Sequence, residues 1–388
     1  MNLDSIPMAT YDYIIIGAGA SGLLLADALG KDNFFAQKTI LLLEKNLHKQ
    51  NDRTWCFWEI GQGDFDDILH KTWDHIFVAD DKFSKRTPIA PYTYKMLRAE
   101  DFYHTYRNKI NGHTNITFLE GNVKEIQDKD HEVLVTTDTD AFKGRKIFNS
   151  IFDYKPLLKQ KRYPVLQQHF IGWFIKTTKP IFDRDQATFM DFSVPQKGNT
   201  RFMYVLPFSQ TEALVEYTLF SENVLLEQEY EGAIKSYLNN LDCKDYEILE
   251  KEKGSIPMSC YNFNVHNSRN ILHIGIAGGW AKPSSGYNFM RTYQKTGALI
   301  PFLKKDKPLN TFFKKDRFWF YDLLLLDILH RKNNKGRLIF GQLFKQRKAQ
   351  SIFKFLDEKT SIWEDLKIIA ACPKKEFIQA LIRRVFLI

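Results

Sequence analysis

The chain has 388 residues, of which 44% are hydrophobic and 26% are charged. This composition is typical of a folded globular protein, usually of two domains at this length, and it excludes wholesale disorder. No apolar run approaches the roughly 20 residues of a membrane-spanning helix, and residues 1–10 lack a signal-peptide pattern. We therefore expect a cytoplasmic protein.

The cysteines and histidines show no pattern typical of a metal site. The four cysteines lie far apart and form no CxxC pair, which predicts buried thiols in a reducing compartment. Of the ten histidines, only His70 and His75, with Asp74 between them, lie close together, and their spacing is not that of a zinc site. We predict no bound metal.

The first fifty residues predict a βαβ unit. Tyr11 to Ile16 is a short apolar run that indicates a buried strand, and Leu23 to Leu29 indicates a helix. Lys38 to Leu43 indicates a second buried strand, which ends in Glu44. The segment 17–22 between the first strand and the helix reads G-A-G-A-S-G.

This segment has the G-x-G-x-x-G spacing of a Rossmann-type dinucleotide site. In such sites the first glycine allows a tight turn, the second lets the backbone approach a pyrophosphate, and the third lets helix and strand pack closely. Glu44 is placed to accept ribose hydroxyls, and its charge would repel the 2′-phosphate of NADP. The predicted contacts are Ile16, Gly17, Ala18, Gly19, Ala20, Ser21, Gly22, Glu44 and Lys45.

Two later segments favour FAD over NAD. Arg53 follows the second strand, where FAD enzymes often place an arginine near the flavin. A further predicted strand, 271–276, ends in a glycine-rich segment that could face the flavin. The additional predicted cofactor contacts are Arg53, Gly275, Ala277, Gly278 and Gly279.

The rest of the chain predicts an α/β protein with a second, β-rich part. Segments 115–119 and 132–137 indicate strands of the first sheet, whereas 170–177, 201–206 and 213–220 indicate antiparallel strands. Segment 226–241 has helical spacing, and the chain after Ser285 is predicted to be mainly helical. We therefore expect an FAD-binding domain from 1–160 and 250–300, a β-rich substrate domain from 161–249 and a helical region from 301–388.

The helical region carries the excess positive charge. Residues 301–388 contain 20 Lys or Arg and 9 Asp or Glu, with aromatic residues between them. A solvated basic face is the simplest interpretation. Docking on anionic lipid is a second, since cations and aromatics suit a membrane interface. Nucleic acid is a third, but no recognition motif supports it.

A set of short motifs in order along the chain resembles the lycopene cyclase family of carotenoid-pathway flavoproteins. These motifs are DRTWCFWE at 52–59, QHFIGW at 168–173, MD at 190–191, RFMYVLPF at 201–208, LVEYT at 214–218, GSIPM at 254–258 and GIAGGWAKPSSGY at 275–287. The resemblance implies a p-hydroxybenzoate-hydroxylase-like architecture that binds FAD. It also implies a lycopene β-cyclase, which closes the open ψ ends of lycopene into the β-ionone rings of γ- or β-carotene without net redox change.

The resemblance also implies the site. Family members are understood to need reduced FAD, for which we expect NAD(P)H as the electron source. Glu216 matches the first acid of the family's short acidic motif and is our candidate proton donor. Trp55, Trp58, Trp280 and Tyr287 are candidates to line a hydrocarbon tunnel, with core packing as the alternative for each. Because lycopene resides in the bilayer, we expect peripheral association of residues 301–388 with the inner face of the cell membrane.

Three positions depart from related patterns. Tyr217 stands where many relatives carry a second carboxylate, which leaves a two-acid mechanism in doubt. Residues 149–153 (NSIFD) replace a glycine-containing turn, and Ile276 stands where flavin hydroxylases have Asp. The alternatives that stay open are a flavin-dependent monooxygenase, an isoprenoid reductase and a non-catalytic carotenoid carrier. The sequence does not indicate an oligomeric state.

Overall fold

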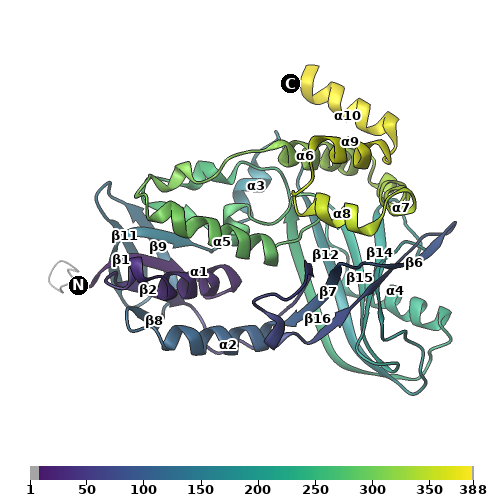
Figure 1. The fold of residues 1–388 in the computed structure, drawn as a ribbon, viewed down its shortest axis with the longest axis horizontal. Coiled ribbons are helices and arrows are strands. Elements are labelled where there is room, and N and C mark those ends of the chain that lie inside the picture. The colour runs from purple at the N-terminus through teal and green to yellow at the C-terminus, as the bar shows by residue number, and fades with distance from the viewer. Residues whose placement is uncertain (1–7, 387–388) are drawn as a thin grey trace.

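The computed structural model describes residues 8–386 and contains three β-sheets flanked by helices. Figure 1 shows the first sheet at the N-terminal end of an elongated molecule and the second sheet at the other end. The helices that follow residue 316 lie over the second sheet. This α/β architecture, with a helical C-terminal region, confirms the fold class predicted from the sequence.

The first sheet has the order β8-β2-β1-β11-β10-β9, with β17 beside β11. The parallel pairs are β1 with β2, β1 with β11, β2 with β8, and β11 with β17. β10 pairs antiparallel with both β9 and β11. The bounds are β1 Thr10–Ile16, β2 Ile40–Glu44, β8 Ile116–Glu120, β9 Val123–Asp128, β10 Val133–Thr137, β11 Ala141–Asn149 and β17 Ile271–His273.

Three helices cover one face of this sheet: α1 (Ala20–Lys31), α2 (Ala99–Asn111) and α5 (Phe289–Leu303). The apolar run of α1 packs with side chains of the other two helices in one buried cluster. Burial of such surface stabilises the fold by roughly 25 cal/mol per Å². The cluster fixes α5, from the last quarter of the chain, against the N-terminal βαβ unit.

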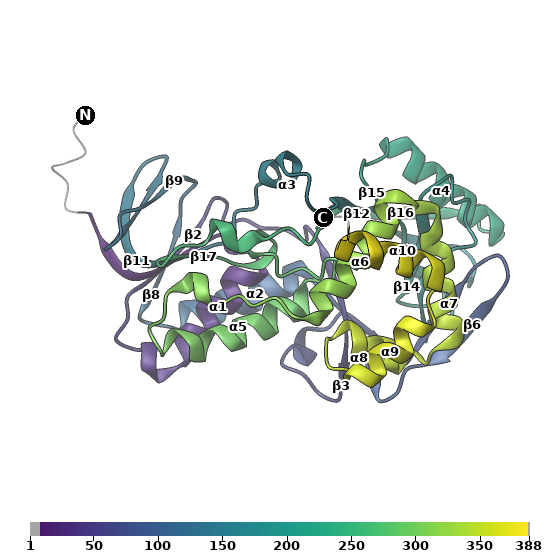
Figure 2. The same ribbon diagram turned by 90° about the horizontal axis from the view of Figure 1, so that it is seen from above.

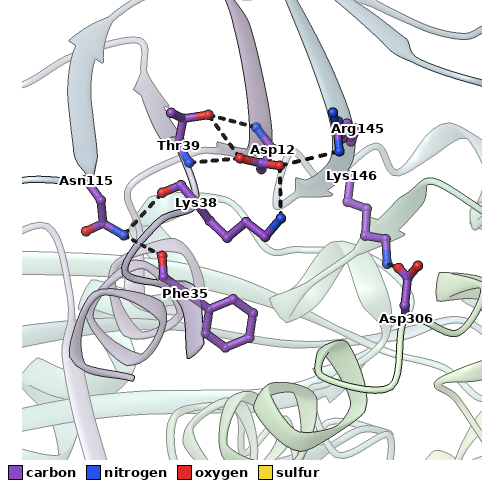
Figure 3. A network of polar contacts seen from close by, with 8 residues as sticks. All are labelled: Asp12, Phe35, Lys38, Thr39, Asn115, Arg145, Lys146 and Asp306. Carbon is purple, nitrogen blue, oxygen red and sulfur yellow. Dashed lines mark hydrogen bonds and ion pairs between the residues drawn. The ribbon is translucent and has the colours of Figure 1, made fainter. Parts of the chain in front are cut away.

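A polar network joins the strands at the end of the sheet opposite the glycine-rich segment (Figure 3). Asp12 accepts hydrogen bonds from the Thr39 backbone N–H at 3.0 Å and from its hydroxyl at 3.3 Å, and it pairs with Lys38 at 3.4 Å. Asn115 donates to the carbonyls of Phe35 and Lys38. These contacts tie β1, β2 and β8 together and so hold their register.

The second sheet has the order β16-β12-β15-β14-β13-β5-β6. All of its pairs are antiparallel except β13 with β5. Its bounds are β5 His75–Ala79, β6 Ser84–Pro88, β12 Leu166–Thr177, β13 Gln186–Asp191, β14 Thr200–Pro207, β15 Glu212–Ser221 and β16 Tyr246–Met258. A small sheet of β3 (Thr54–Ile60), β7 (Tyr92–Arg98) and β4 (Lys71–Trp73) lies alongside.

Helices cover both faces of the second sheet. Figure 2 shows α4 (Glu227–Asn240) on one side and the C-terminal helices on the other. Tyr230, Ile234 and Leu238 of α4 pack on the first face, whereas the C-terminal helices share a separate core with the second. Those helices are α6 Arg317–Arg331, α7 Gly336–Gln346, α8 Ala349–Leu356, α9 Ile362–Ala370 and α10 Lys374–Phe386, and a short α3 spans Lys155–Lys159.

The structure differs from the expected boundaries in three places. β5 and β6 lie in the second sheet, although 75–88 falls within the expected FAD domain, because β5 pairs with β13. β16 pairs with β12 up to Met258, so the second sheet extends beyond residue 249. The predicted strand 271–276 ends at His273, since Gly275 takes a positive φ of 60° and a short 3-10 turn follows.

Candidate functional site

The glycine-rich segment forms a tight turn between β1 and α1. Gly17 has a φ of 91°, and its N–H donates to the Leu43 carbonyl at 2.7 Å. A Cβ on Gly22 would stand 1.9 Å from the Gly17 carbonyl oxygen, so only glycine allows this packing. A Cβ on Gly19 would meet nothing within 4 Å, which leaves the N-terminus of α1 open. An open helix N-terminus attracts phosphate groups.

Glu44 stands beside this turn, as predicted. Its Oε2 accepts a hydrogen bond from the Ala18 N–H at 2.7 Å, and the side chain is buried at the end of β2. Lys49 pairs with Glu44 at 2.8 Å and also donates to the Ala18 carbonyl. The Lys45 side chain is exposed, and the lysine that contacts Glu44 in this structure is Lys49.

The turn after β11 explains one departure noted in the sequence. The Ser150 backbone N–H and hydroxyl both donate to the Ile16 carbonyl, at 3.0 and 2.7 Å. A Cβ on Gly17 would stand 2.2 Å from the Ser150 hydroxyl oxygen. Ser150 therefore closes the end of β1, and Gly17 leaves it the room to do so.

The second glycine-rich segment lies directly against the first. β1 and β17 both pair with β11, so the turns that leave them are neighbours. A Cβ on Gly275 would stand 2.7 Å from the Ser21 hydroxyl of α1, and one on Gly278 would stand 2.1 Å from the His273 carbonyl. Gly279 has a φ of 67°. The structure thus brings together the two predicted cofactor segments, 16–22 and 275–279.

A cavity of about 420 Å³ begins at Ile276 of the second glycine-rich segment and extends under the C-terminal helices. Arg53 and Ile276 line its cofactor end, and Arg53 pairs with Asp52 at 2.7 Å. Phe340, Phe355 and Ile369, from α7, α8 and α9, line the other end. Its volume is typical of a small-molecule site, and most of its lining is apolar.

The predicted acid, Glu216, lies in this cavity and is buried. It belongs to a row of residues in register across four strands: Glu252 on β16, Gly172 on β12, Glu216 on β15 and Tyr204 on β14. Three of these four residues place their side chains in the cavity lining; Gly172 has none. Gly172 separates the two acids, and the Leu214 side chain packs over it.

Burial raises the pKa of Glu216, and the nearby Glu252 raises it further, whereas a hydrogen bond from the Thr218 hydroxyl opposes the rise. Burial also raises the pKa of Glu252, against a hydrogen bond from the Thr54 hydroxyl at 2.8 Å. Desolvation favours the neutral acid because a carboxylate loses its hydration in apolar surroundings. The cavity therefore holds a carboxyl group that retains its proton more readily than one in water.

Aromatic side chains surround the acids. The hydroxyls of Tyr94 and Tyr204 lie 2.6 Å apart, and Tyr287 is near both. Phe189 stacks with Tyr287, with ring centroids 6.5 Å apart. Aromatic faces attract cations by roughly 0.5–2 kcal/mol each. The same wall that excludes water can therefore stabilise a positive charge.

The four predicted substrate residues divide into two groups. Trp55 and Tyr287 line the cavity, and Trp55 stacks on Phe289 at 5.0 Å. Trp58 stacks on Phe353 and donates to Asp357 at 2.9 Å, and it does not line the cavity. Trp280 lines a separate, small pocket. Core packing therefore describes Trp58 and Trp280 better than the predicted tunnel lining.

The sequence did not reveal Glu252, Tyr94 or Tyr204 as parts of the site. Glu252 stands in the alternating charge pattern Glu250-Lys251-Glu252-Lys253, which is typical of an exposed strand. Only the pairing of β16 with β12 places it at the cavity. Its one sequence signal is its position two residues before the motif at 254–258.

Within residues 8–386, no helix combines the length and the hydropathy needed to cross a bilayer. Apolar side chains nevertheless gather on the outer surface of α9 and α10. We call this group the apolar surface of α9 and α10. Its members are Ile362, Trp363, Leu366, Ile378, Leu381, Ile382 and Val385, and Trp363 is 76% exposed.

Solved structures confirm the architecture. A geranylgeranyl bacteriochlorophyll reductase-like protein from Thermoplasma acidophilum superposes with a TM-score of 0.61 at 12% identity, over 96% of this chain and 98% of that one. p-Nitrophenol 4-monooxygenase from Pseudomonas putida gives 0.56 at 12% identity, over 97% and 98%. This chain therefore shares the fold of these two proteins.

Sequence comparison identifies the protein family. Neoxanthin synthase of Solanum tuberosum is 25% identical over 323 residues, which are 76% of this chain and 60% of that protein. Lycopene beta-cyclase of Pantoea ananas is 23% identical over 289 residues, 72% and 71% of the two chains. The chain thus spans about three fifths of the plant relative. The family model "Lycopene cyclase protein" matches residues 12–382, and the chain belongs to that family.

Proposed function

We propose that this protein is a lycopene β-cyclase that binds FAD and isomerises the ψ ends of lycopene to β-ionone rings. The observation that carries the proposal is the burial of Glu216 in an apolar cavity whose lining includes Ile276 of the second glycine-rich segment. A hydrocarbon substrate has no polar group to hold, so shape and a well-placed acid must supply recognition and reactivity. This cavity offers both.

The residues present fit FAD. Gly17 to Gly22 would hold the pyrophosphate at the open N-terminus of α1, and Glu44 would accept from a ribose hydroxyl. Two buried oxygen atoms, Ser285 Oγ and Gln168 Oε1, have no hydrogen-bond partner within residues 8–386. Both residues line the cavity, so these atoms are available to a bound cofactor. Bound in its reduced, anionic form, the flavin would supply negative charge near the cavity. We expect NAD(P)H to be the electron source.

The proposed reaction is acid-catalysed and redox-neutral. Glu216 gives its proton to the terminal C=C bond of the substrate, which forms a C–H bond and leaves a tertiary cation. A neighbouring C=C bond attacks this cation and forms the C–C bond of the ring. The ring cation then loses a proton from an adjacent carbon and becomes a neutral alkene. Tyr287 and Phe189 can stabilise the cation, and the mainly apolar lining limits the access of water that would trap it.

We also propose that the apolar surface of α9 and α10 rests on the inner face of the cell membrane. The opposite side of the same helices reaches the cavity, because Ile368, Ile369 and Phe377 line it. Exposed Lys367, Lys374 and Lys375 stand beside the apolar side chains. Apolar side chains can insert into the bilayer interface while neighbouring lysines contact the anionic headgroups. A carotenoid could then pass from the bilayer into the cavity along α9 and α10, because these two helices would contact both the lipid and the cavity.

Incubation of the protein with lycopene and chemically reduced FAD under anaerobic conditions tests the proposed reaction. We expect a cyclic product of unchanged mass, and we expect Glu216→Gln to abolish it while FAD and lycopene still bind. Product that forms only with oxygen, with added mass, would identify a monooxygenase instead. Lycopene that gains two hydrogens would identify a reductase, and binding without turnover by the unaltered protein would identify a carrier.

A further inference from the structure

Two buried acids face each other across a glycine in the second sheet. Gly172 on β12 is in register with Glu216 on β15 and with Glu252 on β16. A Cβ on Gly172 would stand 2.8 Å from Leu214 Cδ1, 3.3 Å from Glu252 Cγ and 3.4 Å from Glu216 Cβ. Because all three positions are on one face of the sheet, the two acidic side chains lie on either side of Gly172, over which Leu214 packs, and both line the cavity.

The surroundings of the two acids differ. Thr218 donates a hydrogen bond to Glu216, and Tyr204, Tyr287 and Cys56 complete its neighbourhood without a positive charge. Glu252 accepts from Thr54 at 2.8 Å and lies near the guanidinium of Arg98, which itself pairs with Glu250. Two adjacent carboxyl groups cannot both ionise readily at low dielectric. The Thr54 hydrogen bond and Arg98 favour charge on Glu252, and the nearby carboxylate of Glu250 opposes them; the pKa of Glu252 is nevertheless raised less than that of Glu216, which leaves the proton on Glu216.

We propose that Glu252 is the second acid–base residue of this site and that Glu216 and Glu252 hold one proton between them. The proposal rests on the proposed cyclisation for its substrate. Glu216 loses its proton as the first C–H bond forms. After ring closure, the carboxylate of Glu252 takes the proton released from the ring cation. Transfer of that proton from Glu252 to Glu216 restores the starting state, so protons and electrons balance over each turnover.

Glu252 lies on β16, whereas the family motif suggests a second acid at position 217 of β15. Tyr217 follows Glu216 directly, but its side chain lies on the far face of the sheet with Tyr230 of α4. A carboxylate at 217 in this backbone would therefore not reach the cavity. Glu252 does reach it, because β16 and β15 are the two neighbours of β12.

Infrared titration of the FAD-bound protein tests the shared proton without any substrate. The protonated carboxyl band that disappears in Glu216→Gln marks Glu216. We expect this band to titrate at a lower pH in Glu252→Gln, because the variant removes the charge that holds the proton on Glu216. Glu247→Gln, an exposed residue of the same strand, is the matched control and should leave the titration unchanged. An unchanged titration in Glu252→Gln would overturn the inference.

Turnover with lycopene provides the second readout. Glu252→Gln should lower the rate by roughly 10²–10⁴-fold, the usual contribution of a general base, while lycopene binding is retained. Glu252→Asp should recover part of the rate, which a merely structural role would not predict. If the protein does not cyclise lycopene but the infrared titration shifts as expected, the proposed function fails and the proton pair stands. A normal rate in a folded Glu252→Gln overturns the pair.

Discussion

Glu216 and Tyr217 are consecutive residues of β15, yet they face opposite sides of the second sheet. Glu216 lines the cavity, whereas Tyr217 packs in the core under α4, with its ring centroid 6.3 Å from that of Tyr230. Arg201 donates to the Tyr217 hydroxyl at 3.4 Å on that far side. The alternation of side chains along a strand makes this separation unavoidable.

This relationship predicts opposite phenotypes for two neighbouring variants. Tyr217→Phe should lower the free energy of unfolding by about 1 kcal/mol, because a buried hydrogen bond with Arg201 is lost, and should leave turnover unchanged. Glu216→Gln should abolish turnover and leave the fold intact. Thermal unfolding and anaerobic cyclisation assays on both variants give the comparison. Loss of turnover in a folded Tyr217→Phe would contradict the assignment of its side chain to the far face.

The glycine-rich turn allows a second matched pair. In Gly22→Ala the new Cβ would lie 1.9 Å from the Gly17 carbonyl oxygen, so we expect misfolding or severe loss of stability. In Gly19→Ala the Cβ would meet only open space, and the φ of −79° suits alanine. We expect the flavin-free Gly19→Ala variant to fold and to melt at the same temperature as the flavin-free unaltered protein.

The flavin affinity distinguishes the role of Gly19 from that of Gly22. If the pyrophosphate lies against Gly19, its replacement by alanine should weaken FAD binding at least tenfold, which corresponds to about 1.4 kcal/mol. Isothermal titration with FAD measures this directly. Unchanged affinity in Gly19→Ala would show that the cofactor does not approach this part of the backbone.

The sequence predicted those parts of the fold that local patterns encode. Tyr11 to Ile16 is a buried, β-branched run, and the structure has β1 there. Segment 226–241 has helical spacing and forms α4. Long-range pairing was not encoded in this way. The pairing of β5 with β13 joins residues more than a hundred positions apart, and nothing in the local pattern of 75–79 predicts it.

The same limit applies to the site. Glu216 was found through a motif, and the structure places it in the cavity. Glu252 has an equally buried carboxyl, but its strand alternates charges in a way typical of exposed residues. The charged face of β16 becomes buried only at Glu252, where the chain passes beside Gly172. Burial of this kind is a property of tertiary packing and leaves no local signature.

The apolar surface of α9 and α10 leads to a prediction about membrane binding. Replacement of Trp363 and Ile382 by serine should reduce partition onto vesicles of phosphatidylcholine and phosphatidylserine at least tenfold, because burial of one such side chain stabilises by about 1.5–3 kcal/mol. A matched variant, Leu249→Ser, alters an exposed leucine on β16 and should bind as the unaltered protein does. Vesicle co-sedimentation measures the partition.

Salt separates the electrostatic part of this binding from the apolar part. An increase from roughly 0.1 M to 1 M NaCl shortens the Debye length from about 10 to about 3 Å and should weaken the contribution of Lys367, Lys374 and Lys375. Lys304 should contribute little, because it pairs with Asp32 at 2.7 Å beyond the end of α1. Binding that neither the serine substitutions nor salt reduces would exclude this surface as the membrane contact.

The raised pKa values of Glu216 and Glu252 predict how stability depends on pH. The folded protein keeps a proton that the unfolded chain releases above its ordinary glutamate pKa of about 4.3. The folded state therefore binds more protons over this range, and the free energy of unfolding falls as pH rises through the folded pKa values. The contribution of the two neutral acids to stability is fully present below a pH of about 4.3, where the unfolded chain is protonated as well.

Glu216→Gln should remove much of this dependence, since glutamine is neutral at every pH. The unaltered protein and the variant should melt at similar temperatures near pH 4.5, where Glu216 is already neutral. The variant should melt higher as pH rises, by roughly 2–4 °C for each kcal/mol that ionisation costs the unaltered protein. Buried His169 and half-buried His273, whose pKa values are lowered to about 4, act in the opposite direction, but equally in both proteins. A constant melting difference between pH 4.5 and pH 9 would mean that Glu216 is not held neutral by its surroundings.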